Sequence, residues 1–165
     1  MSEQQLFTEI PLEELLGRAA QMKAQGLRFV QCCATRGAEL DAGEGQPPTP
    51  TFELTYSFSN DATYALEHLR VVVTQGQAVP SVSGLFPAAF MFENEMHDLF
   101  GIPVEGISID FQGGFYHLHY PAPMAQAPEK AAKKAPAPKK AEGPAKAGDP
   151  GADAAGPADP APDAQ

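Results

Sequence analysis

The chain has 165 residues, which is enough for one ordinary domain and little more. Its formal net charge is −10, and all of this excess lies in residues 1–124, which contain five Lys and Arg against fifteen acids. Such a segment would repel the phosphates of nucleic acids and anionic lipids, so the charge disfavours nucleic acid as a partner and is compatible with a basic protein.

The N-terminal part of the sequence predicts a helix over residues 11–25. Its apolar side chains recur at helical spacing and form one stripe: Leu12, Leu15, Leu16, Ala19 and Met22. We expect Thr8 to cap this helix, Pro11 to occupy its first turn and Gly26 to end it.

A strand is predicted over residues 27–35. Strict alternation places Phe29 and Cys33 on one side of this strand, and Val30 and Cys32 on the other. The two cysteines therefore point to opposite faces, and neighbouring cysteines rarely form a disulfide. Two thiols also cannot supply the four ligands of an iron–sulfur cluster, so we expect no cluster in this chain.

A loop and two further strands follow. Residues 36–50, rich in Gly, Pro and acids, predict the loop. Residues 51–59 alternate as in a strand, with the large apolar side chains on one side: Phe52, Leu54, Tyr56 and Phe58. Residues 62–74 fit a helix or a strand, and their β-branched second half favours a third strand in a hairpin with the second. One helix, these strands and a second helix predict an α+β domain, a small sheet of mainly antiparallel strands packed by two helices.

The segment from Phe86 to Pro103 reads FPAAFMFENEMHDLFGIP and predicts the second helix. Its apolar stripe comprises Ala89, Phe92, Met96 and Leu99, widened by Ala88, Phe90 and Phe100. Pro87 suits the first helical position, and Gly101 can adopt the left-handed conformation that ends a helix.

Five polar residues are clustered on this helix: Glu93, Asn94, Glu95, His97 and Asp98. Glu95 and Asp98 share one face, and Glu93 and His97 share another. The cluster fits a divalent-metal site, acid/base catalysis, a solvated face, or an acidic helix end that binds Arg or Lys of a partner. The spacing is poor for a metal, and no nucleophile, phosphate loop or oxyanion motif accompanies the acids, so the partner-binding interpretation is favoured.

Two groups of residues near the end of the domain also have alternative interpretations. His117 and His119 lie on one side of a possible strand, where they fit either a metal site or, more simply, surface packing. Phe111, Phe115 and Tyr116 form an aromatic patch, which is either local core or a contact surface for a neighbouring protein.

The composition changes near residue 124. Residues 125–165 contain no Leu, Ile, Val, Phe, Tyr or Met, and a segment with nothing large to bury cannot offset its ordering entropy. The sequence therefore predicts a folded domain over residues 1–124 and a disordered tail rich in Ala, Pro, Lys and Asp over residues 125–165. The tail fits a solubilising extension or, less simply, a docking arm.

The sequence begins with a polar, acidic stretch that lacks the basic start and apolar core of a signal peptide. No run approaches the roughly 18 apolar residues that span a bilayer. We therefore expect a soluble protein of a reducing compartment, which reaches a membrane only through partners.

The second predicted helix carries a family resemblance. Its sequence resembles the signature of the 30-kilodalton subunit of respiratory complex I, which runs Glu-Arg-Glu, two residues later Asp, then two apolar or aromatic residues, Gly and an aliphatic residue. The matching positions are Glu93, Glu95, Asp98, Leu99, Phe100, Gly101 and Ile102. The order of predicted elements over residues 10–110 is also similar to that family.

Two departures distinguish this chain from the pattern it resembles. Asn94 stands where the family has the central Arg, and residues 105–115 replace the family's Gly-His-Pro and Arg-rich segment. In this respect the chain is most similar to the corresponding small hydrophilic subunit of energy-converting, membrane-bound nickel–iron hydrogenases.

The resemblance implies a structural subunit without cofactors, on the cytoplasmic side of the membrane and in the hydrophilic arm of such a hydrogenase. Its implied partners are the large catalytic subunit and the small iron–sulfur subunit, which hold the nickel–iron centre and the iron–sulfur clusters. Glu93, Glu95 and Asp98 are then expected to fix the helix end and pair with basic groups. No catalytic, cofactor-binding or metal-binding residue is expected, and no activity is expected of the chain alone.

Two alternatives stay open. One is the corresponding subunit of an NADH:quinone oxidoreductase, where other chains would also carry the chemistry, because this sequence has no dinucleotide or ATP motif. The other is a stand-alone metal-binding enzyme that uses His97, His117, His119 and the neighbouring acids.

Overall fold

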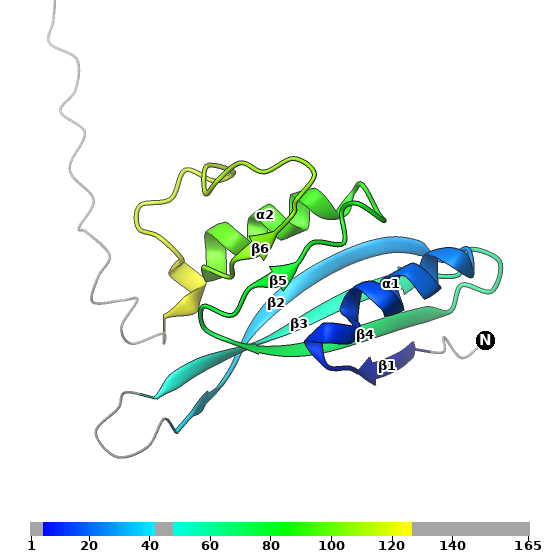
Figure 1. Ribbon diagram of the computed structural model, residues 1–165, viewed down its shortest axis with the longest axis horizontal. Helices are drawn as coiled ribbons and strands as arrows, with labels where there is room; N and C mark the ends of the chain where they lie inside the picture. The colour runs from blue at the N-terminus through cyan, green and yellow to red at the C-terminus, as the bar shows by residue number, and fades with distance from the viewer. Residues whose placement is uncertain (1–4, 42–47, 127–165) are drawn as a thin grey trace, which may run out of the picture.

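The computed structural model describes residues 5–41 and 48–126 (Figure 1). Its main sheet has the strand order β1 (Gln5–Glu9), β4 (Leu66–Thr74), β3 (Thr49–Ser59) and β2 (Arg28–Leu40). The pairs β2–β3 and β3–β4 are antiparallel, whereas β1 runs parallel to β4. The α+β class and the mainly antiparallel sheet packed by two helices are confirmed.

Two helices cover one face of this sheet (Figure 1). The short helix η1 (Leu12–Glu14) leads into α1 (Leu15–Ala24), and α2 (Ala89–Phe100) follows the strands. The remaining elements are β5 (Val79–Pro80), which pairs in parallel with β6 (Val104–Glu105), and η2 (Pro123–Ala125). Lys23 Nζ of α1 donates to the carbonyl oxygen of Leu85 at 2.6 Å, which joins α1 to the segment that enters α2.

The centre of the core is the helix-facing side of β3. The four side chains predicted to share this side are each no more than 1% exposed: Phe52, Leu54, Tyr56 and Phe58. Phe58 lies 5.8 Å from Phe29 and 5.3 Å from Phe86, measured between ring centroids, and Phe52 lies 6.1 Å from Phe100. These aromatic contacts join the middle of the sheet to the segment that enters α2 and to the last residue of α2.

The prediction for Thr8 is wrong. Thr8 lies in β1, where it pairs with Leu69, and no side-chain hydrogen bond caps the start of η1. The strand forms because tertiary contacts are available: the ring of Phe7 stacks on His68 at 4.3 Å and lies under Arg70 at 5.2 Å. A pairing with residues so distant in the sequence cannot be predicted from a five-residue segment alone.

The predicted alternation along residues 27–35 is also wrong. Phe29 and Cys32 are both buried, at 7% and 3% exposure, while Val30 and Cys33 are exposed. A bulge between Phe29 and Gln31 adds one residue to β2 and moves the side chains of residues 31–36 to the other face. The cysteines do point to opposite faces, and both are free thiols.

The ends of several elements differ from the prediction. β2 continues to Leu40, so part of the predicted loop over residues 36–50 is strand; residues 42–47 lie outside the described ranges. The predicted hairpin between β3 and β4 is confirmed. α2 begins at Ala89, with Ala88 at its N-cap, so Pro87 lies before the first helical position.

The packed part of the chain runs slightly past residue 124. Ala125 is 7% exposed and belongs to the core, and its carbonyl oxygen accepts a hydrogen bond from Arg36 Nε at 3.1 Å. The rest of the predicted tail, residues 127–165, lies outside the described ranges. Within those ranges, no helix combines the length and the apolar character needed to cross a membrane.

Candidate functional site

The residues of the candidate site lie on α2 and at its C-terminal end. α2 stops at Gly101, whose φ of +68° is left-handed and whose N–H donates to the carbonyl oxygen of His97 at 2.9 Å. A Cβ at Gly101 would lie 3.1 Å from the Cβ of Ala122. Backbone conformation and close packing therefore both favour glycine here, and the predicted helix stop is confirmed.

Glu93 is fully buried and binds the turn that precedes α2. Its Oε1 accepts the N–H of Val82 at 2.7 Å, and its Oε2 accepts the hydroxyl of Ser81 at 2.6 Å. The hydroxyl oxygens of Ser81 and Ser83 are 2.6 Å apart, and Ser83 Oγ accepts the N–H of Ser108 at 2.8 Å. Burial raises the pKa of the Glu93 carboxyl, although these hydrogen bonds oppose the shift.

Asn94, the residue after Glu93, is 1% exposed and binds the segment that follows β6. Its Nδ2 donates to the carbonyl oxygens of Phe90 at 2.7 Å and Ile109 at 2.8 Å. Its Oδ1 accepts the N–H of Phe111 at 2.9 Å. The amide of Asn94 therefore holds backbone groups both by donating and by accepting hydrogen bonds. A carboxylate only accepts and a guanidinium only donates, so neither could make this set of bonds.

Asp98 and Glu95 both reach Tyr116. Asp98 Oδ2 accepts the N–H of Tyr116 at 2.8 Å, and its Oδ1 lies 3.2 Å from Nδ1 of His97. Glu95 Oε1 is 3.5 Å from the hydroxyl of Tyr116, at the long limit of a hydrogen bond. The charge of Glu95 is the main cause that raises the pKa of Tyr116. The predicted shared face of Glu95 and Asp98 is therefore present.

These contacts give α2 a clear structural role. We call residues 106–121 the strap; this segment contains no helix or strand and lies along α2 (Figure 1). Asn94 and Asp98 hold the strap through backbone groups, and Glu93 holds the turn before the helix. Each buried polar side chain of α2 thus has its hydrogen-bonding groups satisfied by the chain itself.

The location of two signature acids corrects the sequence-based expectation. Glu93 and Asp98 are 0% and 5% exposed, so they are not presented at the surface, and neither pairs with Lys or Arg among the described residues. His97 contacts Asp98 rather than Glu93. Glu95 is partly exposed, and its pairing with a partner's cation stays a prediction.

The apolar members of the signature pack between α2 and the sheet. Ile102 is 1% exposed, and Phe100 makes the contact with Phe52 described above. Leu99 is partly exposed and lines a groove between α2 and β2. The hydrogen bonds of Asn94 to the strap were not predicted, because the sequence showed Asn94 only as one of five clustered polar residues and as the replacement of the family's central Arg.

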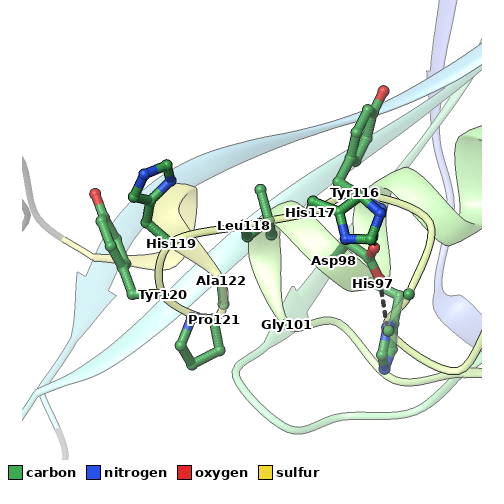
Figure 2. Close-up of a pocket in the computed structure, with 12 residues that line it drawn as sticks. His97, Asp98, Gly101, Tyr116, His117, Leu118, His119, Tyr120, Pro121 and Ala122 are labelled. Atoms are coloured by element: carbon green, nitrogen blue, oxygen red, sulfur yellow. Dashed lines mark hydrogen bonds and ion pairs between the residues drawn. The ribbon is translucent and has the colours of Figure 1, made fainter. Parts of the chain in front are cut away.

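The three histidines proposed for a metal site line one open cavity of about 800 Å³ (Figure 2). His97 comes from α2, whereas His117 and His119 come from the strap, which is irregular here instead of the possible strand. In Figure 2 the three imidazole rings stand apart around the cavity. Across residues 5–41 and 48–126, no three His, Cys, Asp or Glu side chains gather closely enough to hold a metal ion.

The aromatic patch of the strap lies at the surface. The ring of Phe115 makes edge-to-face contacts with Phe111 at 5.3 Å and with Tyr116 at 4.9 Å. Phe111 and Tyr116 remain 46% and 40% exposed. Of the two sequence-based interpretations, this geometry fits a contact surface better than local core.

The fold and the signature helix together define a small α+β domain in which the buried polar side chains of α2 hold the domain's own loops. Residues 8–109 match the family model described as the 30-kDa subunit of respiratory-chain NADH dehydrogenase. The match spans more than half of the chain, and the chain therefore belongs to this family.

Among solved structures, the chain is similar to a chain of an archaeal respiratory complex, the membrane-bound sulfane sulfur reductase. The sequence identity is 19% and the TM-score is 0.49, over 67% of this chain and 62% of the other. The present chain thus spans less than two thirds of the length of that relative. No curated protein matches the sequence.

Proposed function

We propose that this chain is a cofactor-free structural subunit of a membrane-associated, multi-subunit redox complex, and that the complex is an energy-converting nickel–iron hydrogenase. Membership of the 30-kDa subunit family carries the proposal. The geometry of the signature supports it, since the carboxylates of Glu93 and Asp98 and the amide of Asn94 are all engaged in holding this chain's own loops.

In this proposal the chemistry belongs to other chains. The large catalytic subunit holds the nickel–iron centre, and the small subunit holds the iron–sulfur clusters. The present chain lies in the hydrophilic arm on the cytoplasmic side and reaches the membrane only through its partners. Its acidic domain favours basic surfaces on those partners and disfavours nucleic acid.

The second candidate is the corresponding subunit of an NADH:quinone oxidoreductase. The description of the matching family names that enzyme, which favours this candidate. The hydrogenase is favoured by residues 105–115, which replace the Gly-His-Pro and Arg-rich segment expected after the signature. Both candidates predict the same structural role for this chain.

Purification of the tagged full chain from its native membranes in mild detergent tests the proposal. We expect a large nickel-containing subunit and an iron–sulfur subunit to co-purify, together with hydrogen-dependent reduction of an acceptor dye. NADH oxidation without nickel would select the second candidate. A chain that purifies without partners, or one that alone binds stoichiometric metal and turns over a substrate, would contradict both.

A further inference from the structure

The outer edge of β2 is unpaired among the described residues. β2 is the last strand of the sheet, and six consecutive residues, Gln31–Arg36, pair without interruption with β3 on its inner side. No described strand pairs with the other side. Alternate N–H and C=O groups of an edge strand point outward, so this stretch can accept another strand.

A groove of about 300 Å³ runs between this edge and α2. One wall is the strand segment from Gln31 to Ala34. Phe92, Met96 and Phe100, four residues apart on α2, face it as a second, apolar surface, and Leu99 and Glu95 lie beside them. Figure 1 shows α2 above β2, with the chain returning to their vicinity at η2.

The rim of the groove is apolar and acidic. Met124 of η2 lines the groove and is 53% exposed. Glu95 lines the groove and pairs with no Lys or Arg in the described part of the chain. After burial, the charges of Glu53 and Glu95 raise the pKa of Cys33 at the neighbouring edge of β2.

We propose that this groove receives an extended segment of a partner protein, which adds a strand to β2, inserts large apolar side chains against Phe92 and Met96, and brings Lys or Arg to Glu95. Edge strand, apolar pocket and flanking helix are the elements of peptide recognition by strand addition. The proposal rests on the proposed function insofar as a partner subunit supplies the segment.

The chain's own C-terminal residues do not fit this occupant. Residues 127–165 follow Met124 in the sequence, but they contain no large apolar side chain to fill the groove. They are also rich in proline, which has no N–H to donate to a strand ladder. A second copy fits poorly as well, because it would bring two acidic domains and two Glu95 carboxylates together.

Cys33 is a native probe of the outer edge of β2 beside the groove, on the face of the sheet opposite Cys32. It is exposed, whereas the other cysteine, Cys32, is 3% exposed. We would measure the rate of its maleimide modification at pH 8.5 in the isolated full chain and in the assembly purified from native membranes. We expect Cys33 to react readily in the isolated chain, at a rate independent of protein concentration, and at least tenfold more slowly in the assembly.

The other outcomes contradict the proposal in different ways. A Cys33 that is already protected in the isolated chain would show that residues 127–165 or a second copy fill the groove, which overturns the proposal. Equal rates in the isolated chain and in the assembly would overturn the strand addition alone. A chain that purifies without partners would overturn this inference and the proposed function together.

A pair of matched variants tests the same groove by retention of the partner. Leu99→Glu places a charge in the groove, and Leu16→Glu places the same charge on α1, where Leu16 is 42% exposed. We expect Leu99→Glu to lower the yield of co-purified partner at least tenfold and Leu16→Glu to leave it unchanged. Equal yields from two folded variants would contradict the proposal; near-ultraviolet circular dichroism of each isolated chain checks the folding.

Discussion

The sheet and the strap are held by different interactions. The inward side chains of β3 are almost completely buried, and β3 is paired on both edges. The strap has no regular structure, exposes much of Phe111 and Tyr116, and depends on hydrogen bonds from Asn94 and Asp98. Apolar burial is shared among many side chains, whereas the strap depends on two, so the strap should be lost by single substitutions that leave the sheet folded.

The largest expected effect is on the sheet. Phe58→Ala removes a fully buried ring that contacts Phe29 and Phe86, and we expect a loss of about 3–5 kcal/mol in the free energy of unfolding. Urea denaturation followed by circular dichroism measures it. Val72→Ala, at a site 49% exposed in the same sheet, is the control, with an expected change within about 0.5 kcal/mol. A loss below about 1 kcal/mol for Phe58→Ala would be inconsistent with this core.

The second effect is confined to the strap. Asn94→Ala leaves the N–H of Phe111 and the carbonyl oxygen of Ile109 without their partner, at a cost of about 1–3 kcal/mol. Hydrogen exchange should accelerate over residues 109–116 and stay unchanged in β3. Met91→Ala, at a site 44% exposed on the same helix, is the control and should leave exchange in both regions as it was. Acceleration throughout the sheet would show that the strap and the sheet unfold together.

The third effect concerns the junction between α2 and the strap. Gly101→Ala should cost about 1–2 kcal/mol, because a non-glycine residue resists the left-handed conformation. The new Cβ also lies 3.1 Å from that of Ala122. Gly17→Ala is the matched control, since Gly17 lies within α1 with open space around it. This variant should raise the free energy of unfolding by about 1 kcal/mol. Thermal melts that rank the two variants the other way would contradict the role of Gly101.

The smallest effect is a dependence on pH. Burial raises the pKa of Glu93, so the folded chain binds this proton more tightly than the unfolded chain does. The free energy of unfolding should therefore fall as the pH rises upward from the ordinary glutamate value of 4.5. Glu93→Gln should remove this component and Glu13→Gln, on the exposed side of η1, should retain it. Identical pH profiles for the three proteins, measured by urea denaturation, would show that Glu93 makes no such contribution.

The sequence predicted the parts of the fold that local patterns determine and failed where long-range contacts determine the structure. The alternation of residues 51–59 determined the orientation of β3, because apolar side chains at every second position have one way to be buried. Periodicity failed where the cause was non-local. The bulge before Gln31 inverted the predicted faces of β2, and the parallel pairing of β1 required contacts with Phe7 from residues about sixty positions away.

The sequence predicted which residues form the candidate site, but it did not predict that two of its acids are buried or which groups they bind. The signature residues Glu93 and Asp98 were found, but charge on a helix suggested exposure, and their partners include backbone N–H groups, which carry no sequence signal. The role of Asn94 was missed for the same reason. The short Ser81-Val-Ser83 turn and the glycines of the strap were the only local indications that polar loops pack here.

The signature residues of α2 hold the turn before the helix and the strap within this chain, before any partner binds. Hydrogen exchange of the isolated full chain, resolved by residue, tests this most directly. The amides of Val82, Phe111 and Tyr116 should be protected without any partner, and each should lose protection when the side chain that accepts its hydrogen bond is replaced by Ala. Exchange of all three at the rate of an unfolded peptide, with protection only after assembly, would contradict it.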